Sequence, residues 1–209
     1  MTGQFFYSFV AFFVVIDPVG NAAIFAGLMR GASEEYRRDV ALRGVVIATI
    51  LLLAFAFGGE PLLRALGITL PAFRIAGGIL LFLVAAEMVF ARRWGIRSPT
   101  EPEQEEATHS ADISVFPLAF PLLAGPGALT SIVLLMGRAT APLAAAAVIA
   151  ALAAVMLLAF ALLVAAPQLV RALGVTGTNV VSRVLGIILA ALAAQLVLDG
   201  IAEGLERAS

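Results

Sequence analysis

The sequence predicts an all-helical protein that crosses a membrane six times, as two three-helix repeats of opposite orientation. Three observations predict this fold: an apolar composition, six long apolar segments, and matching interruptions in the first and fourth of them. Of the 209 residues, 62% are hydrophobic and only 13% are charged, whereas soluble domains are about half apolar and a quarter charged. Because so much apolar surface requires lipid as its solvent, we expect the lipid bilayer to be a partner of this chain.

Six segments are long enough to span a bilayer, since a transmembrane helix needs about 20 mainly apolar residues. They are predicted at residues 5–29, 42–66, 71–90, 113–136, 142–166 and 180–201. The glycines and proline within residues 58–61 could end the second segment early. The polar stretch between the third and fourth segments separates three spans from three.

The two halves of the chain resemble each other at a nearly constant spacing. Pro18 aligns with Pro126 at an offset of 108, and Arg74 aligns with Arg183 at an offset of 109. Because each half has an odd number of spans, the second copy must insert upside down, which gives an inverted repeat typical of secondary transporters. We therefore predict a first repeat, a cytoplasmic polar linker and a second repeat at residues 1–90, 91–112 and 113–209.

The distribution of arginines predicts the orientation in the membrane. The loops after the first, third and fifth segments contain Arg30, Arg37, Arg38, Arg43, Arg92, Arg93, Arg97 and Arg171. The opposite side contains only Arg64, Arg138 and Arg207, with Arg74 near a boundary. Since the arginine-rich side of a membrane protein faces the cytoplasm, both termini are predicted on the outer side.

The composition also argues against several classes of site. Cysteine is absent, so the chain has neither disulfides nor thiolate metal ligands, and the one histidine, His109, falls in the polar linker. The net charge of -1 provides no electrostatic footprint for nucleic acid. We therefore expect no metal, no cofactor and no nucleic-acid partner.

Asp17, Pro18, Gly20 and Asn21 interrupt the first segment near its centre. A carboxylate at that depth costs about 2.5–3.5 kcal/mol, so Asp17 should face the bundle interior or water. Pro18 frees nearby carbonyls, Gly20 permits close approach, and Asn21 offers both a donor and an acceptor. We predict that these four residues bind substrate and that Asp17 is the candidate for proton coupling. A compatible structural role for Asp17 is to cap a helix that begins at Pro18.

Gly125, Pro126 and Gly127 interrupt the fourth segment, and Thr130 and Ser131 follow one turn later. A new helix N-terminus after this interruption would attract a carboxylate through its free amides and its dipole. The two hydroxyls could add donors, and the small residues leave room only for a small ligand. We predict that these five residues also bind substrate, although a proline kink satisfied by neighbouring helices is the structural alternative.

Three further polar residues are predicted to support the site. Arg74 and Arg183 occupy equivalent positions in the two repeats, where they either reach toward an interface or hold the interrupted segments, for example by pairing with Asp17. Gln195 is expected to make a hydrogen bond between helices rather than to contact substrate.

The stretches 17–21, 116–131 and 183–195 together resemble the MarC family, whose members are also called small neutral amino acid transporters and are grouped with the LysE-type exporters. The resemblance covers essentially the whole chain, including the six-span layout. It implies a multi-pass protein of the inner (plasma) membrane of a bacterium or archaeon. It also implies transport of amino acids of the glycine and alanine class, with proton coupling left open.

We thus predict a secondary transporter that binds a small zwitterion between the two interruptions. Its carboxylate would meet the amides after Pro126, and its ammonium would meet Asp17 or the carbonyls freed beside it. An exporter or channel for another small metabolite is the alternative, and a homo-oligomer is left open. An intramembrane enzyme is not expected, because Asp17 and Asp199 lie at different predicted depths and a histidine partner is missing from the spans.

Overall fold

The computed structural model describes residues 2–90 and 113–208, and the regular structure within these ranges is helical throughout. The elements are α1 (Thr2–Ile16), α2 (Pro18–Leu28), α3 (Glu34–Ala65), α4 (Leu70–Phe90), η1 (Ser114–Leu123), α6 (Pro126–Arg138), α7 (Pro142–Val164) and α8 (Ala166–Ala208). The predicted all-helical class is therefore confirmed. The predicted polar linker, with His109, lies outside the described residues.

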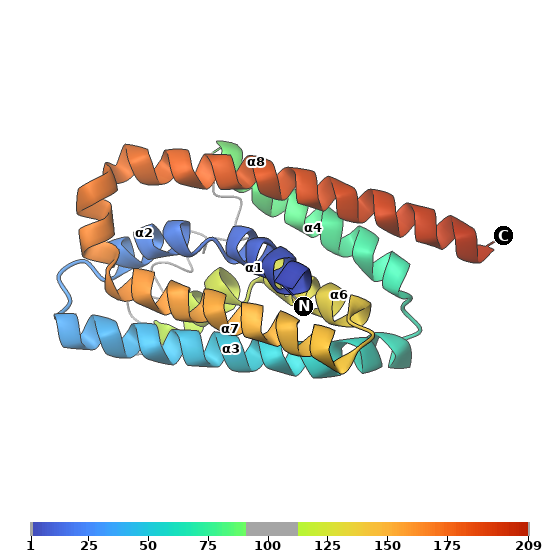
Figure 1. Cartoon of the computed structure of the whole chain (residues 1–209). Helices are drawn as coiled ribbons and strands as arrows, with labels where there is room; N and C mark the ends of the chain where they lie inside the picture. The colour runs from blue at the N-terminus through green and yellow to red at the C-terminus, as the bar shows by residue number, and fades with distance from the viewer. Residues whose placement is uncertain (1, 91–112, 209) are drawn as a thin grey trace.

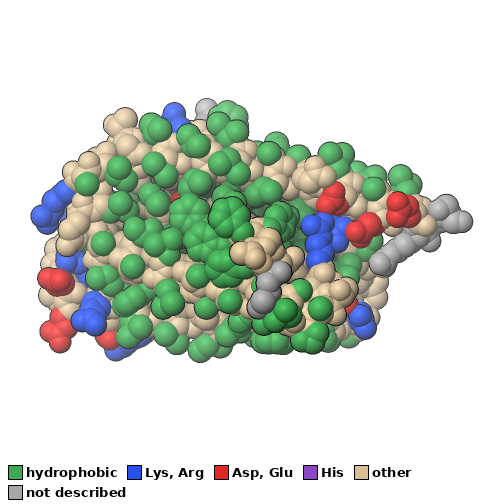
Figure 2. Space-filling view, viewed as in Figure 1, with side chains coloured by type: hydrophobic (Ala, Val, Ile, Leu, Met, Phe, Trp, Pro, Cys, Tyr) green, Lys and Arg blue, Asp and Glu red, His purple; other side chains and the backbone are tan. Residues whose placement is uncertain are grey.

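The described helices are long and apolar enough to cross a membrane five or six times. Five candidate spans are Thr2–Leu28, Glu34–Ala65, Leu70–Phe90, Pro142–Val164 and Thr176–Glu206. A sixth arises if η1 and α6, which are bent by 55° relative to each other, form one span. Figure 2 shows a broad hydrophobic middle on the visible face, with charged side chains gathered toward its two ends.

The interrupted elements lie in the centre of the bundle (Figure 1). α4 packs along α8 on one side, and α3 packs against α7 on the other. Between these two pairs lie α1, α2, η1 and α6. α1, α2 and α6 contact helices of both pairs, and η1 packs against α3. The residues at the breaks, among them Asp17, Asn21 and Leu123, are buried inside the bundle.

α3 begins earlier than predicted, at Glu34, but it continues through Pro61 and ends at Ala65, within one residue of the predicted end. A proline inside a helix removes one backbone hydrogen bond and crowds the preceding turn. Here the helix is 32 residues long and buries Leu63 beyond the proline, so tertiary packing keeps the last turn helical. The early end that residues 58–61 could have caused does not occur.

α8 begins earlier than predicted and contains one residue outside helical geometry. Gly174 has φ 66° and ψ 174°, and the candidate span begins just after it, at Thr176. This backbone conformation is nearly exclusive to glycine, because other residues lose about 1–3 kcal/mol there. Gly174 thus sets the angle between the short first part of α8 and its membrane-spanning part.

We expect Gly174→Ala to lower the free energy of unfolding by about 1–3 kcal/mol. An added Cβ at Gly174 would meet nothing within 4 Å, so the cost comes from the backbone alone. The matched control is Gly58→Ala on an exposed face of α3, where a Cβ likewise meets nothing and alanine favours the helix. Thermal unfolding in detergent measures both variants, and equal stability of Gly174→Ala and wild type would contradict the prediction.

Candidate functional site

The turn between α1 and α2 is built around Asp17, which is 1% exposed. Its backbone is left-handed, with φ 46° and ψ 69°, a conformation that aspartate and asparagine adopt more readily than other side chains. Its Oδ1 accepts a hydrogen bond from the Gly20 amide over 3.0 Å, which caps α2 as expected. Its Oδ2 accepts from the Ser182 hydroxyl of α8 over 3.5 Å.

Gly20 is required by the position of the Asp17 carboxylate. An added Cβ at Gly20 would overlap Oδ2 of Asp17 and lie 3.0 Å from the Ser182 hydroxyl oxygen. Pro18 is the first residue of α2, where its missing amide hydrogen is not needed by the helix. The sequence Asp-Pro-x-Gly therefore builds a turn that holds one carboxylate inside the bundle.

The second interruption has a different local structure. Phe116 and Phe120 leave helical geometry within η1, each directly before a proline, which disfavours the helical backbone of the preceding residue. Gly125 is extended, with φ -69° and ψ 171°, and α6 begins at Pro126 without a side-chain cap. The first amides of α6, including that of Gly127, therefore belong to a helix N-terminus whose N-cap residue, Gly125, has no side chain to cap them.

Asn21 joins the two interruptions. Its Nδ2 donates to the carbonyl oxygen of Ile16 over 2.8 Å and to that of Leu122 over 3.0 Å. The side chain is fully buried, and Leu122 lies 101 residues further along the chain. The last carbonyl of α1, the first turn of α2 and the end of η1 are thus held together by one amide group.

A small cavity lies beside the second interruption. Its volume is about 20 Å³, which is room for a single water molecule. Leu122, Gly125, Pro126 and Gly127 line it, together with Val15 of α1. In the described conformation the predicted glycine and proline residues therefore surround space too small for an amino acid.

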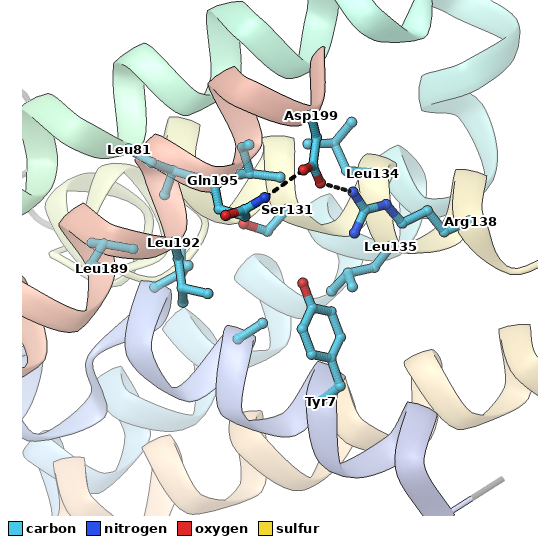
Figure 3. A pocket seen from close by; sticks show the side chains of 13 residues that line it. Tyr7, Leu81, Ser131, Leu134, Leu135, Arg138, Leu189, Leu192, Gln195 and Asp199 are labelled. Carbon is cyan, nitrogen blue, oxygen red and sulfur yellow. Dashed lines mark hydrogen bonds and ion pairs between the residues drawn. The ribbon is translucent and has the colours of Figure 1, made fainter. Parts of the chain in front are cut away.

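The two predicted hydroxyls of α6 have different surroundings. Thr130 is buried against α4, where an added Cβ at Gly77 would overlap its methyl group. Ser131 instead lines a larger pocket of about 60 Å³ between α1, α4, α6 and α8 (Figure 3). Of the pair, only Ser131 borders a cavity that could admit a ligand.

Polar groups occupy one end of this larger pocket. Arg138 of α6 and Asp199 of α8 form an ion pair of 2.7 Å. Gln195 donates from Nε2 to the other oxygen of Asp199 over 2.7 Å, and Figure 3 shows the three side chains pointing toward one another. Because Gln195 and Asp199 lie on the same helix, the expected hydrogen bond of Gln195 between helices is wrong.

Of the roles that the sequence leaves open for Arg74, pairing with Asp17 is not observed. The Arg74 side chain is 5% exposed and forms an ion pair of 2.5 Å with Glu203 of α8. Because α4 packs along α8, the acidic group within reach of Arg74 belongs to that helix rather than to the α1–α2 turn. Arg183, the equivalent residue of the second half, lies exposed on α8.

Three residues of these sites, Ser182, Arg138 and Asp199, were not predicted as site residues from the sequence. Ser182 belongs to no sequence motif that would predict its hydrogen bond to Asp17. Arg138 and Asp199 lie 61 positions apart, so no local pattern predicts their pairing. Among the described residues, no cluster of three or more histidine, cysteine, aspartate or glutamate side chains could hold a metal ion.

The chain is similar to membrane proteins of bacteria and archaea. A sequence model described as MarC family integral membrane protein matches residues 2–205. A UPF0056 membrane protein of Archaeoglobus fulgidus is 35% identical over 96% of this chain and 93% of its own length. The UPF0056 inner membrane protein YhgN of Escherichia coli is 34% identical over 92% of this chain and 93% of its own length. No solved structure matches the chain. With the family model covering nearly the whole sequence, the chain belongs to the MarC family of integral membrane proteins.

Proposed function

We propose that this protein is a secondary transporter that binds a small neutral amino acid where its two interrupted segments meet. The observation that carries the proposal is the double hydrogen bond of Asn21, which brings Ile16 and Leu122 to one point inside the bundle. Interrupted segments in a membrane bundle supply the backbone donors and acceptors that a polar solute needs there. Paired interruptions at one point favour a substrate site over two unrelated kinks.

The chemistry around this point suits a zwitterion. The uncapped N-terminus of α6 at Pro126 offers amides and a favourable dipole to a carboxylate. The buried carboxylate of Asp17 and the carbonyl groups beside it offer acceptors to an ammonium group. Since the neighbouring cavity is small, the segments must separate before a ligand binds, and glycine or alanine requires the least separation.

The proposal includes the inverted repeat and the orientation derived from the sequence. In Figure 1, α3 runs opposite to α7 and α4 runs opposite to α8, as two copies of opposite orientation require. The end of the bundle that holds Arg30, Arg37 and Arg171 would face the cytoplasm of a prokaryotic cell. Both termini would then lie on the outer side of the inner membrane.

The proposed activity contains no catalytic step. A pair of aspartates in contact would favour hydrolysis within the membrane. Here Asp199 binds Arg138 and Gln195, whereas Asp17 binds Gly20 and Ser182. The different surroundings of the two carboxylates favour transport over this alternative.

Counterflow of radiolabelled glycine or alanine into proteoliposomes tests the proposal. We expect Asp17→Asn to fold, since asparagine also tolerates the left-handed turn. We expect its uptake to fall by about tenfold to a hundredfold, because a charged hydrogen bond to the ligand is worth about 1.5–3 kcal/mol. The matched control is Asp39→Asn on α3, whose carboxylate is half exposed and pairs with Arg43.

Two outcomes would contradict the proposal. If Asp17→Asn transports as fast as Asp39→Asn and wild type, the α1–α2 turn does not bind the ligand. If wild type takes up neither amino acid above the level of protein-free vesicles, the protein does not transport these substrates. Proton coupling is measured in the same vesicles as substrate-dependent acidification of the lumen, which Asp17→Asn should lack.

A further inference from the structure

The larger pocket lies apart from the interruptions and has a different chemistry. One end carries the charged pair Arg138 and Asp199 with Gln195, while leucines and the ring of Tyr7 form much of the remaining wall (Figure 3). The pocket lies at the end of the bundle where α6 ends, at Arg138. A cation and an anion are thus fixed side by side at the edge of an apolar cavity.

The ion pair between Arg138 and Asp199 is about one-third exposed, with 37% and 30% of the two side chains accessible. Pairs of this exposure contribute about 0–1 kcal/mol to stability, so little is lost when one opens. Arg138 projects from α6 and Asp199 from α8, and a hydrogen bond from Gln195 orients the Asp199 carboxylate. The pair therefore adds little to folding, but it holds two opposite charges in a fixed arrangement.

We propose that Arg138, Asp199 and Gln195 form an entry site for the zwitterionic group that all α-amino acids share. The ligand carboxylate would take the place of Asp199 on the guanidinium of Arg138, whose planar fork suits a carboxylate. The ligand ammonium would take the place of Arg138 on Asp199. This inference rests on the proposed transport function and adds a second site for the same class of substrate.

The charges of the ligand explain why a zwitterion is favoured. Inserting a zwitterion between Arg138 and Asp199 replaces one ion pair with two, so both protein charges stay compensated. A carboxylate without an ammonium would leave Asp199 without its partner, and an amine without a carboxylate would do the same to Arg138. The entry site should therefore bind glycine much better than acetate or methylammonium.

The pocket also leads toward the interruptions. Val15 lines both this pocket and the small cavity at Gly125–Gly127. Leu81 lines the pocket and also lies against the second interruption. One of its methyl carbons would be 2.7 Å from a Cβ added at Gly127. The pocket thus reaches from the charged pair at the end of α6 toward side chains that border the second interruption.

The absence of cysteine from the whole sequence provides a direct test. A single cysteine in place of Leu192, which lines the pocket, can be labelled with a membrane-impermeant methanethiosulfonate reagent. The control is Leu143→Cys at the start of α7, which is 56% exposed and does not line the pocket. Both reporters are placed in the Asp17→Asn chain, so that binding where the two interruptions meet does not contribute.

We expect glycine at about ten times its dissociation constant to slow labelling of Leu192→Cys by about tenfold. Acetate and methylammonium at the same concentration should leave the rate unchanged, as should glycine at Leu143→Cys. Adding Arg138→Gln or Asp199→Asn to the reporter should remove the protection. Unchanged labelling of Leu143→Cys and an unchanged elution volume in detergent show that these variants fold.

Three outcomes would overturn the entry site. Protection by acetate or methylammonium equal to that by glycine would mean that the pocket does not recognise a zwitterion. Protection that survives Arg138→Gln and Asp199→Asn would place the ligand elsewhere. Glycine counterflow by wild type without protection of Leu192→Cys would leave the transport function standing and remove this site, whereas failure of counterflow would count against the function itself.

Discussion

Asn21→Asp should abolish glycine uptake and lower the free energy of unfolding by about 2 kcal/mol or more. The Nδ2 group of Asn21 donates to the carbonyl oxygens of Ile16 and Leu122. A carboxylate of the same size has no hydrogen to donate and would face both oxygens in a fully buried position. The two interruptions would then repel each other at the point where they now meet. Counterflow and thermal unfolding in detergent measure the two effects.

The chain offers a matched control for this change. Asn179 is the other asparagine of the sequence, and it lies exposed on α8. We expect Asn179→Asp to unfold within about 0.5 kcal/mol of wild type, as surface substitutions do. If Asn21→Asp matches Asn179→Asp in both stability and uptake, the hydrogen bonds of Asn21 do not hold the two segments together.

Gly77→Val should prevent α4 from packing against α6 and reduce uptake to the background level. A Cβ at Gly77 would overlap the methyl group of Thr130 and lie 3.1 Å from its Cβ, between two buried helix faces. Overpacking of this kind costs about 1–3 kcal/mol, and valine adds two further methyl groups. Thermal unfolding in detergent should therefore show a clearly lower midpoint, or the variant should fail to accumulate in the membrane.

Two further variants separate a steric effect from a general cost of replacing glycine. Gly58→Val on α3 adds a side chain where a Cβ meets nothing within 4 Å, so its midpoint should remain close to that of wild type. Thr130→Ser removes the methyl group that the new Cβ would meet, so Gly77→Ala with Thr130→Ser should be more stable than Gly77→Ala alone. Equal stability of these two chains would contradict the proposed contact.

Local signals predict much of the helical layout. α4 begins within one residue of its predicted start, because Pro71 and the apolar run after it define a helix start. The cap at Asp17 follows from the Asp-Pro pair alone, and the observed hydrogen bond to Gly20 matches it. The start of α8 could not be found in the same way. Its first part is helical up to Gly174, and the change of direction depends on the backbone of that glycine.

The side-chain partners that could not be predicted from the sequence are those between distant parts of the chain. The bond from Asn21 to Leu122 joins residues 101 positions apart, and the ion pair between Arg74 and Glu203 joins residues 129 apart. Hydrophobic periodicity defines which face of a helix is buried but does not determine which helix covers it. The sequence alone therefore leaves Asp17 open as a partner of Arg74, whereas the packing of α4 along α8 places Glu203 beside it.

The proposed transport of a small zwitterion through the meeting point of the two interruptions is tested most directly with the wild-type protein. Proteoliposomes loaded with unlabelled glycine, and matched vesicles without it, are given increasing concentrations of radiolabelled glycine. A carrier predicts uptake that saturates with external glycine and is faster in the loaded vesicles. Uptake that rises linearly with external glycine and is equal in loaded and unloaded vesicles would indicate a channel. Uptake equal to that of protein-free vesicles would contradict the proposal altogether.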